Sequence, residues 1–202
     1  MHGSESISPW VARWSHLVPA GSTVLDVACG LGRHALHFSK LNHPITCVDI
    51  AQAAIDEVAT KLPPTAQLKV ADIENGPWPF MENGAPQQFG AVVVTNYLWR
   101  AVLPTLVASV APGGVLIYET FAHGNASVGK PSRPDFLLQP GELLAACAGL
   151  RVVAYEDGFV SAPERFVQRI VAVREMADAA LGNAAHQKPD DPASISPPRY
   201  RL

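Results

Sequence analysis

Apolar and polar positions follow one another in blocks along the chain, and the blocks predict strands and helices in turn. Runs rich in apolar residues predict strands at 23–29, 44–50, 66–73, 89–99 and 114–122. Amphipathic segments predict helices at 10–18, 32–41, 51–62, 100–110 and 141–149. Residues 74–88 are turn-rich, and residues 123–139 are expected to form a long loop.

Two further strands are predicted at 151–160 and 165–173, with only four residues between them. So short a connection requires antiparallel pairing. The earlier strands alternate with helices, which favours parallel pairing with right-handed crossovers. We therefore expect an α/β fold, a Rossmann-like seven-stranded and mostly parallel sheet that ends in an antiparallel hairpin and carries helices on both faces.

The length of 202 residues suits one compact domain with small terminal additions. Residues 1–22 are expected to form an N-terminal helix or lid over the binding site, and residues 23–175 the ligand-binding domain. Residues 176–202 are poor in core-forming side chains and are predicted to be a disordered tail.

Composition narrows the class of protein. The three cysteines are far apart, which predicts free thiols and a reducing compartment, and the net charge of −3 comes without a basic stripe. No signal peptide and no apolar run of membrane-spanning length is visible. We expect a cytoplasmic protein with no membrane or nucleic-acid partner and no metal; His34 and His37 lie one turn apart but lack a third ligand.

Polar residues collect where the predicted strands end, at the edge where open α/β sheets bind ligands. The residues concerned are Asp26 with Gly30-x-Gly32, then Asp49, Asp72, Asn96-Tyr97 and Glu119. Gly30-x-Gly32-x-x-Ala35 alone also fits a dinucleotide loop. A carboxylate at Asp26 would repel a pyrophosphate and attract a cation, so the three acids together fit S-adenosylmethionine better than NAD.

These segments resemble the motifs of class I S-adenosylmethionine-dependent methyltransferases. VLDVACGLGRHA is similar to motif I, CVDIA to motif II and VADIE to the region after it, while FGAVVVTNYL and APGGVLIYETF resemble the motifs on strands four and five. The resemblance covers about residues 7–175. SPWVARW, CGLGRHAL, NYLWR and YETFAHGN are further similar to a branch of small bacterial methyltransferases related to tellurite-resistance and thiopurine enzymes.

The resemblance implies that S-adenosylmethionine is the cofactor and S-adenosylhomocysteine the product. It implies that Asp49 binds the ribose hydroxyls with Ile50 against the adenine, and that Asp72 accepts from the adenine amine. Together with the argument from Asp26, it assigns cofactor contacts to Asp26, Ala28, Gly30, Gly32, Asp49, Ile50, Asp72, Ile73 and Asn96. Two departures matter: Ala126 stands where an acid is common in the branch, and Thr95–Leu98 lacks the Asn/Asp-Pro-Pro-Tyr run of enzymes that methylate nucleic-acid amines.

Methyl transfer is an in-line displacement that needs an aligned acceptor and, for weak nucleophiles, a base. The candidates for catalytic residues are Tyr97, Glu119 and His123, although Glu119 could equally tie down the following loop. Aromatic or charged groups on the acceptor side are predicted at Trp10, Trp14, Trp99 and Arg100. The tryptophan pair at positions 10 and 14 fits a buried helix face equally well, and Arg13 could bind the cofactor carboxylate or lie in solvent.

The leading hypothesis is therefore a methyltransferase acting on a small molecule. A second is a catalytically inactive S-adenosylmethionine-binding module with a regulatory role. An NAD-dependent oxidoreductase is a third, which Asp26 and the terminal hairpin disfavour, and another transfer such as aminopropyl transfer is a fourth.

Overall fold

A computed structural model describes residues 6–176 and 200–201. Most of the predicted tail, residues 177–199 and 202, lies outside the described residues. Among the helices that are described, none combines the length and the apolar character needed to cross a membrane.

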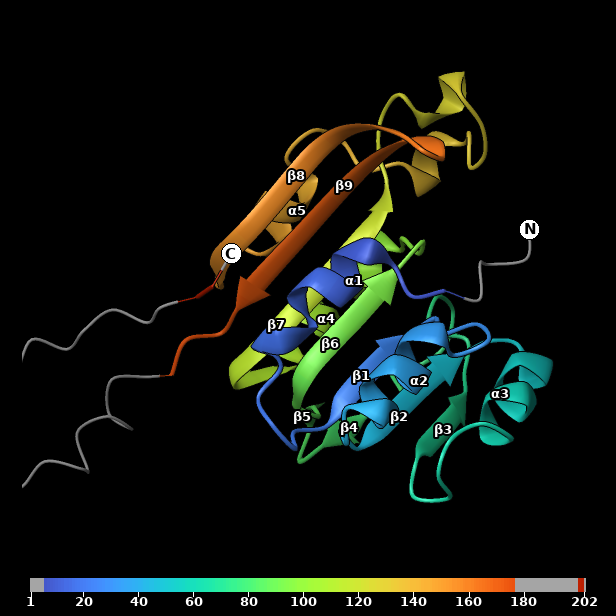
Figure 1. Cartoon of the computed structure of the whole chain (residues 1–202), viewed down its shortest axis with the longest axis vertical. Coiled ribbons are helices and arrows are strands. Elements are labelled where there is room, and N and C mark those ends of the chain that lie inside the picture. Colours follow the sequence, from blue (N-terminus) through green and yellow to red (C-terminus); the bar gives the residue numbers. More distant parts are fainter. Residues whose placement is uncertain (1–5, 177–199, 202) are drawn as a thin grey trace, which may run out of the picture.

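The sheet has seven strands in the order β3-β2-β1-β6-β7-β9-β8 (Figure 1). Their bounds are β1 Val24–Val27, β2 Ile45–Asp49, β3 Gln67–Val70, β6 Phe89–Thr95, β7 Val110–Phe121, β8 Arg151–Ser161 and β9 Glu164–Val173. The first five are mutually parallel, and β9 runs antiparallel to both β7 and β8. The predicted fold is confirmed, and β9 is inserted between β7 and β8.

Helices cover both faces of this sheet, α1 and α2 on one and α4 and α5 on the other (Figure 1). Their bounds are α1 Pro9–Trp14, α2 Arg33–Lys40, α3 Gln52–Ala59, α4 Leu103–Ala108 and α5 Glu142–Ala146. All five are shorter than predicted. Two 3-10 turns replace some of the missing length, η1 Ser15–Leu17 and η2 Arg100–Val102, and two more lie in the predicted loop, η3 Asn125–Ser127 and η4 Pro134–Phe136.

Two further differences concern strands. Residues 81–86 hold a small hairpin, β4 Met81–Glu82 and β5 Ala85–Pro86, inside the turn-rich segment. The fifth predicted strand starts four residues early, because Val110 already pairs with Phe89 before the register shifts. Both changes lie at the amino-terminal side of the parallel strands; at the carboxyl edge β1, β3 and β6 end at residues 27, 70 and 95, earlier than the predicted 29, 73 and 99.

The alternation of side chains along the strands sorts the core into two layers. Val92 and Val94 pack with α4 and α5, whereas Ala91 and Val93 pack with α1, α2 and α3. The same alternation fixes the side on which each polar residue lies at the carboxyl edge. Asp26, between Leu25 and Val27 of the α4 layer, consequently faces the α1 and α2 side.

Helix α1 is fixed to the sheet by its first turn. Pro9 occupies the first helical position, and the Ser8 side chain accepts from the Trp10 N–H at 3.1 Å. Trp10 and Trp14 are both buried, and Trp10 Nε1 donates to the Ile170 carbonyl at 3.4 Å. The tryptophan pair thus belongs to the core between α1 and the sheet.

Candidate active site

A cavity of about 240 Å³ opens at the carboxyl edge of β1, β2 and β3. Its lining residues come from consecutive strand ends: Ala28, Val48, Asp49, Ile50, Ala71, Asp72, Ile73, Glu74 and Tyr97. Of the predicted cofactor residues, the structure brings together Ala28, Asp49, Ile50, Asp72 and Ile73, and it adds the predicted catalytic Tyr97. Asp26, Gly30, Gly32 and Asn96 are not among the lining residues.

Asp49 joins the end of β2 to the glycine loop. Its Oδ2 accepts from the Gly30 N–H at 2.8 Å, and its Oδ1 accepts from the Ala51 N–H at 2.9 Å. A carboxylate oxygen can accept a second hydrogen bond, so both oxygens retain acceptor capacity toward a ligand. The carboxylate is therefore held in place by the backbone before any ligand binds.

The loop that follows β1 needs glycine at position 32. Gly32 precedes α2 with φ of +74°, and a Cβ there would lie 2.8 Å from Val58 Cγ2 on α3. Gly30 also has a positive φ of +53°, but a Cβ there would meet no heavy atom within 4 Å. Gly32 thus allows α2 to start close to α3, whereas Gly30 serves the turn alone.

Asp72 lies just beyond β3 and organises the turn that closes the cavity. Its Oδ1 accepts from the backbone N–H groups of Glu74 and Asn75, each at 3.0 Å, and its Oδ2 accepts from Asn75 Nδ2 at 3.0 Å. These hydrogen bonds, the Asn75 side chain first, lower the pKa of Asp72. The group is therefore an anion at the rim of the cavity at neutral pH.

Asp26 does not face the cavity. It is 2% exposed on the α1 and α2 side, where it accepts from the Ala35 N–H at 3.0 Å in the first turn of α2. Burial raises the pKa of Asp26 to about 7, against the opposing effects of the Ala35 N–H and the Arg33 charge. The argument that this carboxylate lies against a bound cation does not match the geometry, in which it supports the helix that follows the loop.

Tyr97 lines the cavity from the segment that follows β6. Burial, with the Glu74 carboxylate close by, raises the pKa of Tyr97, so its hydroxyl remains protonated at neutral pH. The backbone is fixed there, because Tyr118 Oη donates to the Tyr97 carbonyl at 2.8 Å. The neighbouring Asn96 is exposed in the left-handed region at φ of +54°, and its N–H donates to the Glu119 carbonyl at 2.9 Å.

The other candidates for catalysis lie outside this cavity. Glu119 is 1% exposed, and its carboxylate accepts from Ser8 Oγ at 2.8 Å and from Arg169 Nη1 at 3.1 Å. It thereby anchors the start of α1 to β7 and β9. His123 is exposed at the beginning of the loop 123–139, where its backbone N–H donates to the Leu138 carbonyl.

The predicted acceptor-side residues make structural contacts. Arg100 Nε and Nη2 bind the Glu142 carboxylate at 2.7 and 3.0 Å, and its Nη groups also donate to the carbonyls of Asp135 and Leu137. Arg100 therefore fastens the loop to α5. Trp99 packs, partly buried, against the α4 layer of the core.

Sequence reasoning missed a polar cluster on the α1 side of the same edge. Ser8 N–H donates to His34 Nε2 at 3.3 Å, and His34 Nδ1 lies 3.4 Å from Thr95 Oγ1. Burial lowers the pKa of His34 to about 3, so the ring is neutral. Across the described ranges, no group of three or more potential metal ligands gathers, and His34 serves as a buried acceptor for the residue that caps α1.

Comparisons with known proteins agree with this fold. Residues 24–114 match the model of a family described as a methyltransferase domain. The chain is similar to a solved S-adenosylmethionine-dependent methyltransferase from Methanosarcina mazei, at 14% identity over 85% of this chain and 100% of that one, with a TM-score of 0.63. It is also similar to TehB from Haemophilus influenzae, at 18% identity over 84% of this chain and 63% of that one, with a TM-score of 0.65.

A third solved structure holds a ligand. The glycopeptide N-methyltransferase MtfA, in complex with S-adenosylhomocysteine, is 18% identical over 82% of this chain and 88% of that one, with a TM-score of 0.55. No curated protein matches the chain in sequence. Residues 24–114 thus resemble a methyltransferase domain, and the chain has the fold of the class I S-adenosylmethionine-dependent methyltransferases, as its motifs predict.

Proposed function

We propose that this protein is a methyltransferase that binds S-adenosylmethionine and methylates a small-molecule acceptor. The observation that carries the proposal is the cavity between Asp49 and Asp72, two carboxylates at successive strand ends with Ile50 and Ile73 beside them. This set of acceptors and apolar side chains fits a nucleoside, because a diol needs paired acceptors and a purine needs apolar faces with an acceptor for its amine. The S-adenosylhomocysteine complex of MtfA supports the same choice of ligand.

Different residues would bind different parts of S-adenosylmethionine. Asp49, held by two backbone N–H groups, would accept from the two ribose hydroxyls. Ile50, whose side chain is 65% exposed, would lose that exposure against the adenine, and Asp72 would accept from the adenine amine. The glycine loop would bring its backbone to the methionyl part, with Asn96 opposite it.

When bound, S-adenosylmethionine supplies a methyl group on a sulfonium that a nucleophile can displace. The chain would align the acceptor and exclude water. Tyr97, protonated at neutral pH, would act by donating a hydrogen bond or by its ring rather than as a base. His123 remains the proposed base, because Glu119 already holds Ser8 and Arg169.

Calorimetry with S-adenosylmethionine and S-adenosylhomocysteine tests the binding step. We expect the wild type to bind both, and Asp49→Ala to bind about ten- to a hundredfold more weakly, as for the loss of hydrogen bonds to a charged group. Asp56→Ala, an exposed acid on α3, is the matched control and should bind as the wild type does. Unchanged affinity in Asp49→Ala would refute the ribose assignment, and binding of NAD instead would refute the proposal as a whole.

Incubation with labelled S-adenosylmethionine and a cell extract tests the transfer step. We expect the label in a small metabolite, identified by mass spectrometry. Label in RNA or protein would contradict the proposed acceptor class. Binding without any transfer would favour the inactive regulatory module.

A further inference from the structure

Arg165, on β9, is a partly buried cation whose hydrogen-bonding capacity is incompletely used among the described residues. Its side chain is 18% exposed, and its Nε is buried with no hydrogen-bond partner among residues 6–176 and 200–201. Its ion pair with Glu119 is long, with 3.8 Å between Nη2 and Oε2. A guanidinium carries five donors in a planar fork, so one that makes a single long ion pair retains donors that a ligand can use.

The neighbouring carboxylates are already engaged by other donors. Glu119 accepts from Ser8 Oγ at 2.8 Å and from Arg169 Nη1 at 3.1 Å, both shorter than its distance to Arg165. Glu156 binds Arg169 through Nε and Nη2. Arg169 is thus satisfied between two carboxylates, and Arg165 is not.

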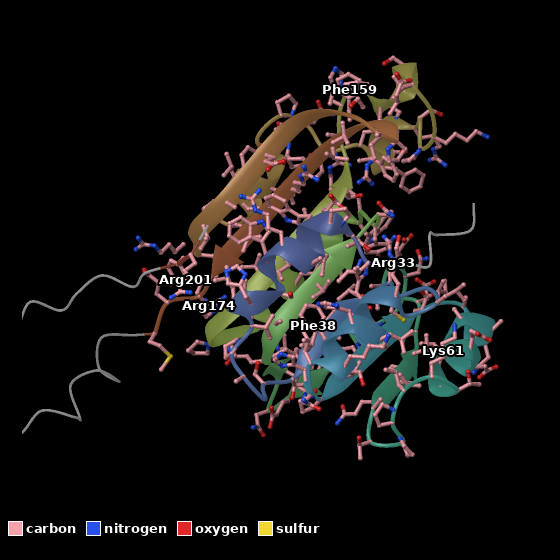
Figure 2. The ribbon with its side chains drawn as sticks, viewed as in Figure 1. Arg33, Phe38, Lys61, Phe159, Arg174 and Arg201 are labelled. Carbon is pink, nitrogen blue, oxygen red and sulfur yellow. The ribbon has the colours of Figure 1, made fainter. Side chains whose placement is uncertain are left out.

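The position of Arg165 relates it to the proposed methyl-transfer site. Glu119 pairs directly with Thr95, the last residue of β6, and Asn96 and Tyr97 follow. Arg33, the first residue of α2, places Nη2 3.5 Å from Thr95 Oγ1, and Figure 2 shows it beside the carboxyl end of β6. The arginines therefore flank the strand end next to the cavity, on the side away from the nucleoside residues.

We propose that Arg165 binds a carboxylate of the methyl acceptor, with Arg33 adding positive potential, so that the substrate is a small organic acid. This inference rests on the proposed methyltransferase function and names its substrate class. A planar carboxylate matches the fork of one guanidinium in a bidentate manner and would bind the donors that remain accessible on this partly exposed side chain. An acceptor held there would extend from β9 toward Asn96 and Tyr97.

The first test uses the arginine Nε–H signals in nitrogen-15 NMR spectra of the S-adenosylhomocysteine-loaded protein. Benzoate, at constant ionic strength, should shift the Arg165 signal in a saturable way, whereas the neutral isostere benzamide should not. Arg165→Gln assigns the signal, and the exposed Arg133 serves as the control that does not move. No shift with benzoate, or an equal shift with sodium chloride, would overturn the proposal.

The second test compares variants for binding and turnover. Arg165→Gln should keep the affinity for S-adenosylhomocysteine within twofold. It should raise at least tenfold the KM for the acceptor that the labelling experiment identifies. The KM of Arg165→Lys should fall between those of Arg165→Gln and the wild type. Arg133→Gln should behave as the wild type. A labelled product whose acceptor lacks a carboxylate would refute the inference while leaving the proposed function intact, and a wild type that does not bind S-adenosylhomocysteine would refute both.

Discussion

Protonation of two buried groups, His34 and Asp26, should change the stability of this protein in opposite directions as the pH falls from 7 to 5. The pKa of His34 lies at about 3, below its ordinary value of 6.5, because burial disfavours the charged ring. The unfolded chain therefore takes up this proton first, so the stability due to neutral His34 is full above pH 6.5 and is lost as the pH falls below it.

Protonation of Asp26 has the opposite effect on stability. Its folded-state pKa of about 7 lies above the ordinary value of 3.8, again because of burial. The folded protein takes up this proton first, so stability is gained as the pH falls through 7 and is full below 3.8. At neutral pH the buried carboxylate therefore destabilises the folded state, and its protonation at lower pH removes this destabilisation.

The two effects have similar size. A proton bound by only one of the two states changes the free energy of unfolding by about 1.4 kcal/mol per pH unit. Between pH 7 and pH 5 this gives a loss of about 2 kcal/mol from His34 and a gain of about 2 kcal/mol from Asp26. In the wild type the two contributions should therefore nearly cancel, leaving almost no net change in the free energy of unfolding between pH 7 and pH 5.

Urea unfolding at pH 7, 6 and 5 separates the contributions. Asn at position 26 can still accept from the Ala35 N–H, and Gln at position 34 can still accept from the Ser8 N–H, so both variants preserve the local hydrogen bonds. Relative to the wild type, Asp26→Asn should lose about 2 kcal/mol on going from pH 7 to pH 5, and His34→Gln should gain about 2 kcal/mol. If the free energy of unfolding changed with pH in parallel for the wild type and Asp26→Asn, the Asp26 carboxyl would not be held at a raised pKa.

The remaining predictions concern the glycine loop and the start of α1. Gly32→Ala should destabilise by about 2–4 kcal/mol in urea unfolding, because left-handed strain adds to a contact of 2.8 Å with Val58, whereas Gly30→Ala should cost only about 1–2 kcal/mol of strain; equal costs would contradict the steric argument. Ser8→Ala should lower the free energy of unfolding by about 1–3 kcal/mol, because it removes a helix cap and a donor to a buried carboxylate. Ser15→Ala, at a half-buried position that hydrogen-bonds to no charged group among the described residues, is its control, with an expected change below about 0.5 kcal/mol.

The strands were predictable from sequence wherever both faces are buried. β1, β6 and β7 read as apolar runs because helices cover them on either side. The edge strand β3 was predicted to extend to residue 73, but pairing stops at Val70 because its partner β2 ends at Asp49. The length of an edge strand depends on its neighbour, which local sequence does not report.

Part of the site was predictable for the same reason. Asp49 and Asp72 follow strands whose ends are easily located, and parallel strands bring those ends to one edge. The side of the sheet on which a residue lies depends on its exact position within the strand, because neighbouring side chains alternate. Asp26, one residue before the end of β1, consequently points into the α2 interface, and spacing to the glycines could not decide this.

Arg165 and Arg169 show why residues on the proposed acceptor side are harder to predict from sequence than residues on the proposed cofactor side. The cavity proposed to bind the nucleoside is built from consecutive β-α units, so its residues follow one another within 24–97. Arg165 and Arg169 meet Glu119 only because β9 inserts between β7 and β8, with Arg169 directly opposite Glu119. Had β8 paired with β7 instead, these arginines would lie on an edge strand, away from Thr95 and Asn96. The order of the last two strands therefore decides which charges face the proposed acceptor site, and a four-residue hairpin connection is compatible with either order.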